Sequence, residues 1–159
     1  MGWLRLLVVA LLSAVLNSPP VVPRSFIPPN GWTRGNDLPG GPDAIWLSPR
    51  FGVNGNGENL GVISHRVAAG ATLASEVREA IREMTEDRII GASHSEPTCH
   101  GKQSGWSFEA RLPLPNGTAI SQVYHITVVH GRAYAFVFTH KAGDAIEPVV
   151  ADAIQSICP

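Results

Sequence analysis

The sequence predicts an α+β fold in which two main helices pack on one antiparallel β-sheet. Three observations carry this prediction. Most of the chain reads as short segments with strand periodicity, two segments have an apolar face at helical spacing, and tight-turn residues join neighbouring strand segments. The predicted order is two strands, a helix, four strands and a helix. Because this order lacks repeated strand–helix–strand crossovers, it favours an antiparallel sheet over a parallel one.

The first half of the predicted domain supplies two strands and a helix. Residues 44–47 and 60–67 are short apolar strand candidates, separated by a loop rich in glycine and asparagine. Thr72 is suited to cap a helix that begins at Leu73, because a threonine hydroxyl accepts a hydrogen bond from the first free backbone N–H groups. The apolar face of this helix is formed by Leu73, Val77, Ala80, Ile81 and Met84.

The second half supplies four strands and the last helix. The strand candidates are residues 88–92, 106–112, 120–129 and 132–139. Asn116-Gly117 predicts a two-residue type I′ hairpin turn, and His130-Gly131 marks a second tight turn. The final helix is expected to open with Asp144 and Glu147 in capping-box spacing and to present an apolar face. That face consists of Ile146, Val149, Val150, Ala153, Ile154 and Ile157.

Length and composition limit the class of protein. The chain has 159 residues, 44% of them hydrophobic and 16% charged, with 12 basic and 13 acidic side chains and a net charge of −1. This length suits a single domain, and the apolar content is enough for a core rather than a disordered tail. A binder of nucleic acid or of an anionic membrane usually carries a clear basic excess. We therefore expect no nucleic-acid partner.

The N-terminus has the layout of a secretory signal peptide. Arg5 precedes an apolar run from Leu6 to Leu16, as in the short basic and apolar regions of such peptides. The run is too short to span a bilayer, which takes about 20 apolar residues. A buried core helix is the alternative, but the prolines that follow separate the run from the rest of the chain.

The predicted organisation is therefore a signal peptide at 1–18, a proline-rich extended lead-in at 19–31, and a single α+β domain at 26–159. We expect a secreted or periplasmic protein with no stable membrane span after signal removal.

The element order resembles a known family. The Asn30-Gly31-Trp32 entry, the strand–helix unit at 60–86, the strands at 106–139 and the helix at 144–157 are similar to the PsbP-like fold, an α/β/α sandwich. That family includes an extrinsic photosystem II subunit, Ran-binding Mog proteins, secreted bacterial lipoproteins and chaperones for type VI secretion effectors. The resemblance implies a non-enzymatic module that binds or stabilises protein partners. The chain lacks the acylatable cysteine of the lipoprotein members and a plant-type transit signal.

The two cysteines, Cys99 and Cys158, are expected to form a disulfide, because an even pair in an exported chain favours one. The bridge would join the 93–105 loop to the end of the last helix. The alternatives are free thiols or a reactive thiol. A reactive cysteine needs a cationic or helix-N-terminal environment, whereas Cys158 follows a predicted helix C-terminus.

The six histidines raise a metal hypothesis, since His94, Cys99 and His100 lie close in sequence and His65, His125, His130 and His140 could join them. No His-x₃-His or Cys-x₂-Cys spacing is present. The run Gly101–Gly105 fails as a phosphate loop because Gln103 stands where Ser or Thr is required. The aromatic residues suit a sheet core better than a pocket. We predict no catalytic residue, metal or cofactor.

Three function classes remain open. The favoured one is an exported, non-catalytic module that binds or stabilises a protein partner. A carrier of a small apolar ligand would need a large apolar cavity. A hydrolase or metalloenzyme would need a histidine–acid pair at a cleft or three convergent ligands.

The partner surface is predicted on the loop between Ser48 and Asn59, which is longer than the usual hairpin connection of about 2–5 residues. Long loops on rigid scaffolds often carry recognition, and Phe51 and Val53 are apolar residues on this polar segment. A passive, flexible connector is the alternative. The predicted binding residues are Phe51, Gly52, Val53, Asn54, Gly55, Asn56 and Gly57.

Overall fold

The computed structural model describes residues 21–84 and 88–159. The predicted signal peptide at 1–18 lies outside these residues, as do the first two prolines of the lead-in. The described part of the lead-in forms turns without a helix or strand. None of the helices in residues 21–84 and 88–159 has the length and apolar character needed to cross a membrane.

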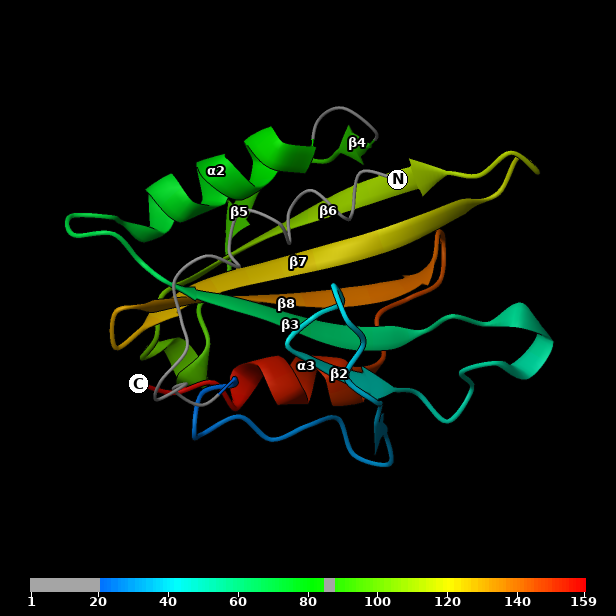
Figure 1. Ribbon diagram of the computed structural model, residues 1–159, viewed down its shortest axis with the longest axis horizontal. Helices are drawn as coiled ribbons and strands as arrows, with labels where there is room; N and C mark the ends of the chain where they lie inside the picture. Colours follow the sequence, from blue (N-terminus) through cyan, green and yellow to red (C-terminus); the bar gives the residue numbers. More distant parts are fainter. Residues whose placement is uncertain (1–20, 85–87) are drawn as a thin grey trace.

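Within the described residues, eight strands form one antiparallel sheet in the order β1-β2-β3-β8-β7-β6-β4, with β5 also paired to β6 (Figure 1). The strands are β1 (Thr33–Arg34), β2 (Ala44–Leu47), β3 (Asn59–Arg66), β4 (Ile89–Ile90), β5 (His94–Ser95), β6 (Gly105–Pro113), β7 (Ala119–Val129) and β8 (Arg132–Lys141). The three longest strands, β6, β7 and β8, are neighbours and form the centre of the sheet.

The sheet is the middle layer of three, as the predicted α+β class requires. Helix α2 (Leu73–Met84) covers one face, while α3 (Pro148–Gln155) and the segment before β1 cover the other (Figure 1). Strand residues alternate between the faces. Tyr124 and Ile126 of β7 pack with α2, whereas Tyr134 and Phe136 of β8 pack with α3.

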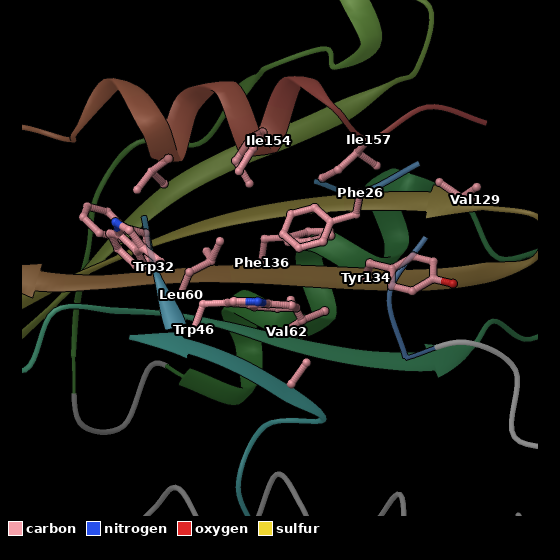
Figure 2. Packing of buried hydrophobic residues seen from close by; sticks show 14 residues of the cluster. Phe26, Trp32, Trp46, Leu60, Val62, Val129, Tyr134, Phe136, Ile154 and Ile157 are labelled. Atoms are coloured by element: carbon pink, nitrogen blue, oxygen red, sulfur yellow. The ribbon is translucent and has the colours of Figure 1, made fainter. Parts of the chain in front are cut away.

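The core on the α3 side is rich in aromatic residues (Figure 2). Phe26 packs on Trp46 and Phe136, with ring centroids 5.1 and 5.0 Å apart. These contacts attach the N-terminal segment to the middle of the sheet. Further members of this cluster are Trp32, Leu60, Val62, Val129, Tyr134, Phe138, Val150, Ile154 and Ile157. The aromatic residues of this cluster are thus core, as the sequence predicts for a half-buried sheet.

Helix α2 begins where the sequence predicts. The Ser75 N–H donates to the Thr72 hydroxyl at 3.2 Å, and the Thr72 N–H donates to the Ser75 hydroxyl at 2.9 Å. These two bonds form a reciprocal cap in which serine replaces the usual Glu or Gln.

Helix α3 begins four residues later than predicted, so the expected start at Asp144 is wrong. It starts at Pro148, and Glu147 is the N-cap residue with extended backbone angles (φ −67°, ψ 138°) and no side-chain cap bond. The reason is Pro148. Proline fits the first helical position but pushes the residue before it out of the helical region. The Glu147 carboxylate is left free to contact Arg50.

The two predicted hairpin turns have different outcomes. At the β7–β8 turn, His130 and Gly131 both have positive φ (47° and 74°), as a type I′ turn requires. The type I′ prediction for Asn116-Gly117 is wrong. There the Gly117 N–H donates to the Leu114 carbonyl at 3.0 Å and only Gly117 has positive φ. Pro115 fixes a type I turn, and Gly117 follows in the left-handed region.

The outer edge of β6 also differs from prediction. The strand expected at 88–92 is only Ile89–Ile90, which pairs with Ala110–Arg111. An unpredicted strand, β5, pairs with Trp106–Ser107. Two-residue edge strands show no apolar alternation, so sequence periodicity cannot locate them.

Candidate functional site

The predicted binding loop is ordered by its own hydrogen bonds. The Ser48 N–H donates to the Glu58 carbonyl at 3.2 Å, which closes the base of the loop. Nearer the tip, the Gly52 N–H donates to the Asn56 carbonyl at 2.6 Å, and the Asn56 side chain accepts from the Glu58 N–H at 2.8 Å. A short 3₁₀ turn, η1 (Val53–Gly55), lies between these contacts. The loop therefore has a defined shape.

One ion-pair cluster attaches this loop to helix α3. The Arg50 guanidinium lies 2.5 Å from Glu58 Oε2 and 2.7 Å from Glu147 Oε1. Glu58 is only 2% exposed, and a buried carboxylate is costly unless a cation and hydrogen bonds compensate it. Arg50 provides that cation and joins the loop to the N-cap of α3.

The apolar residues of the loop point outward. Phe51 is 43% exposed and Val53 is 56% exposed, although both are large hydrophobic residues. The loop extends past the end of the sheet beyond β2 and β3 (Figure 1). The structure thus places all seven predicted residues, Phe51 to Gly57, on one protruding and internally bonded segment.

The predicted disulfide is present. Cys99 and Cys158 are bonded, and the Thr98 hydroxyl donates to the Ile157 carbonyl at 2.8 Å beside the bridge. Cys99 lies in a 3₁₀ turn, η2 (Cys99–Gly101), and Cys158 follows α3. The two contacts hold the 96–104 loop against the end of the helix.

A histidine–acid pair lies on the α3 side of the sheet. Nδ1 of His125 is 3.4 Å from the Glu96 carboxylate. The hydrogen bond with His125 is the main reason that the pKa of Glu96 is lowered. The other ring nitrogen, Nε2, is buried without a hydrogen-bond partner in the described residues, and a Cβ on Gly105 would lie only 2.6 Å from it.

This pair lacks the access that a general base needs. A catalytic histidine must bring a ring nitrogen within hydrogen-bond distance of its substrate. Here Nδ1 faces Glu96 and Nε2 faces the backbone of Gly105, although both residues of the pair border a cavity of about 210 Å³. The geometry is that of a structural pair.

The remaining histidines do not converge. His65 pairs with Glu76 at 2.7 Å, and His140 stacks on Phe138 at 4.7 Å. In residues 21–84 and 88–159, no three His, Cys, Asp or Glu side chains are grouped so that they could hold a metal ion.

A second hollow is one that sequence reasoning missed. It has a volume of about 830 Å³ and is lined by residues of the β7–β8 turn and of the end of the chain. That turn and the Phe51 loop lie at opposite ends of the sheet (Figure 1). Three arginines line it: Arg24, Arg66 and Arg132. They come from the lead-in and from two different strands, so no sequence motif unites them.

The three layers, the strand order and the two helices define a PsbP-like α+β fold. The solution structure of cyanobacterial PsbP (CyanoP) from Synechocystis sp. PCC 6803 is similar with a TM-score of 0.54 and 16% identity, over 82% of this chain and 87% of that one. LpqN of Mycobacterium tuberculosis, described as involved in cell envelope biogenesis, is similar with a TM-score of 0.51 and 11% identity, over 82% of this chain and 75% of that one. No protein-family model and no curated protein sequence matches the chain. The predicted fold is confirmed.

Proposed function

We propose that this chain is an extracytoplasmic, non-catalytic module that binds a protein partner through the loop at 48–58. The observation that carries the proposal is the combination of order and exposure on this loop. Arg50 fixes it to α3, and Phe51 and Val53 remain exposed at its tip. A loop that is already ordered loses little conformational entropy on binding, and exposed apolar side chains can anchor a partner.

The extracytoplasmic location is supported by two features. The Cys99–Cys158 disulfide is typical of oxidising compartments. The apolar run at Leu6–Leu16 has the sequence of a signal peptide. A PsbP-like fold shared with LpqN, a protein of cell envelope biogenesis, is compatible with this location.

The two alternative functions have weaker support. The larger hollow is lined by arginines and the smaller has a volume of only about 210 Å³, so neither is the large apolar cavity of a carrier. The His125–Glu96 pair has no accessible ring nitrogen for hydrolysis.

Site-specific photo-crosslinking in the native host tests the proposal. A photoreactive amino acid at Phe51 or Val53 should give one discrete crosslinked protein. The matched control is Ile89, which is 64% exposed on β4 and lies on the opposite edge of the sheet. Equal crosslinking from all three positions, or none from Phe51 and Val53, would overturn the proposal.

A further inference from the structure

The arginine-lined hollow contains a like-charge pair that the fold does not neutralise. Arg66 of β3 lies directly opposite Arg132 of β8. Directly opposed side chains in an antiparallel pair have Cβ atoms about 4.5–5.5 Å apart, and like charges at such positions are destabilising. In the described part of the chain, neither arginine forms an ion pair with a carboxylate.

The hydrogen bonds of Arg132 leave most of its donors available. Its Nε donates to the Ser64 hydroxyl at 3.1 Å, and its terminal amino groups have no hydrogen-bond partner among the described residues. The carboxylate of Asp43 binds Ser64 instead: its Oδ2 accepts hydrogen bonds from the Ser64 N–H at 2.7 Å and from the Ser64 hydroxyl at 3.2 Å. The guanidinium fork of Arg132 therefore faces the hollow with free donors.

The third cation is brought in by the N-terminal segment. Arg24 stands next to Ser25, whose hydroxyl donates to the Cys158 carbonyl at 3.0 Å and accepts from the Cys158 N–H at 2.7 Å. Since Cys158 is disulfide-bonded to Cys99, the backbone beside Arg24 is fixed. A chain with a net charge of −1 thus places three arginines around one hollow.

A phenol adds a neutral donor to the same hollow. Tyr134 lies two residues after Arg132 on the same face of β8, and its ring packs against Phe136. Figure 2 shows its hydroxyl pointing away from the apolar cluster. This hydroxyl has no hydrogen-bond partner among residues 21–84 and 88–159. Burial raises the pKa of Tyr134, so the phenol stays protonated and can donate at neutral pH.

We propose that this hollow is a binding site for a phosphate group, presented by a lipid headgroup or as free phosphate. Arginine forks match the oxygen geometry of phosphate and make strong charge-assisted hydrogen bonds with it. A volume of about 830 Å³ falls within the range of ligand pockets. The walls between the arginines include Val67, Ala68, Ala69 and Val129, which provide an apolar surface for a substituent on the phosphate.

Isothermal titration calorimetry on the full chain tests the site with three probes: dihexanoyl phosphatidic acid, inorganic phosphate, and dihexanoylglycerol, which has the same acyl chains without the phosphate. We expect phosphatidic acid to bind and Arg66→Gln to weaken it about tenfold or more, because a hydrogen bond to a charged group contributes about 1.5–3 kcal/mol. Tyr134→Phe should weaken binding by a smaller factor. Arg78→Gln, on the exposed face of α2, makes the same charge change away from the hollow and should leave binding unchanged.

The probes separate the two sources of phosphate. Tighter binding of phosphatidic acid than of inorganic phosphate assigns a lipid headgroup, and equal binding assigns free phosphate. Either result must depend on Arg66. A second measurement needs no variant: the NMR chemical shifts of the backbone amides of Val67, His130 and Gly131 should change when phosphatidic acid is added. The proposal is overturned if dihexanoylglycerol binds as tightly as phosphatidic acid, if Arg66→Gln changes nothing, or if those amides do not shift.

Discussion

At the residue scale, Glu58 shows how a charged side chain fixes the shape of the loop at 48–58. The carboxylate is buried, and its Oε2 is bonded to Arg50. Burying a carboxylate without a partner is unfavourable because the protein interior solvates charge poorly. Arg50 therefore stabilises the loop by compensating Glu58, even though the arginine itself is half exposed.

We predict that Arg50→Met lowers the free energy of unfolding by about 1–3 kcal/mol, because Glu58 then loses its cation. Adding Glu58→Gln should restore part of this loss, since the carboxylate that required Arg50 is gone. Urea denaturation of the wild type, both single variants and the double variant measures the coupling. Independent effects of the two substitutions would show that the ion pair does not hold the loop.

Glu96 gives a pH-dependent prediction. Its pKa is lowered in the folded protein, chiefly by the hydrogen bond with His125. The ionised carboxylate therefore stabilises the fold at pH values above its unfolded pKa of about 4.3, and this contribution disappears as the pH falls through the lower folded pKa. The stability difference between wild type and Glu96→Gln should shrink as the pH is lowered from about 6 to 3. Urea denaturation across this range measures it, and a constant difference would contradict the assignment.

At the scale of elements, the disulfide holds the end of α3 in place. Helix α3 has only eight residues, and helices this short depend on tertiary contacts. The Cys99–Cys158 bridge joins its C-terminal end to the loop before β6, while Ser156 accepts a hydrogen bond from the Ile27 N–H at 2.8 Å. Its position is thus fixed from two sides.

Replacing Cys99 and Cys158 together by serine should lower the free energy of unfolding by about 2–5 kcal/mol, because the unfolded chain is no longer constrained. The same loss should appear when the wild type is unfolded in reducing buffer, which serves as the control. Since Cys158 also borders the arginine-lined hollow, phosphate binding should weaken in the variant at temperatures where it remains folded. Unchanged stability in both experiments would exclude a stabilising bridge.

The elements that sequence predicts well are those whose pattern is local. The alternation of Tyr134, Phe136 and Phe138 identifies β8, and Thr72 identifies the start of α2, because each signal lies within the element itself. Pro148 is also a local signal for the late start of α3, because a proline disfavours the helical region for the residue before it, and this effect overrides the capping-box spacing of Asp144 and Glu147. The loop at 48–58 could be identified as a candidate binding loop because its length and its two apolar residues are local properties.

The arginine-lined hollow could not be predicted in this way. Arg66 and Arg132 become neighbours only through the β3–β8 pairing, which a non-local register determines. The same holds for His125 and Glu96. The Nε2 atom of His125 is inaccessible because the backbone of Gly105 packs against it. Sequence reasoning could name a histidine–acid pair as a possibility, but the packing around it is a three-dimensional property.

At the scale of the whole molecule, the two proposed sites lie at opposite ends of the sheet (Figure 1). The loop at 48–58 follows β2, and the arginine-lined hollow surrounds the β7–β8 turn. The sheet between them is continuous, with β3 and β8 paired from Asn59–Thr139 to Arg66–Arg132. The structure shows one arrangement of this sheet, and coupling between distant sites requires an element with two arrangements that both sites bias.

We therefore predict that the two sites are independent. The double variant Phe51→Ser, Val53→Ser should lose crosslinking to the protein partner from a photoreactive residue at Asn54. It should keep the Kd for phosphatidic acid within about twofold, because the free-energy effects of substitutions at distant sites are additive to within about 0.3–0.5 kcal/mol. Arg66→Gln should weaken phosphate binding and leave crosslinking at Val53 intact.

The same substitution should leave the melting temperature of the ligand-free protein unchanged or slightly raised, since it relieves the repulsion between Arg66 and Arg132. Calorimetry, crosslinking and thermal denaturation on the same variants measure all three quantities. A Kd change of tenfold or more in the loop variant would show that the sheet transmits binding from one end to the other.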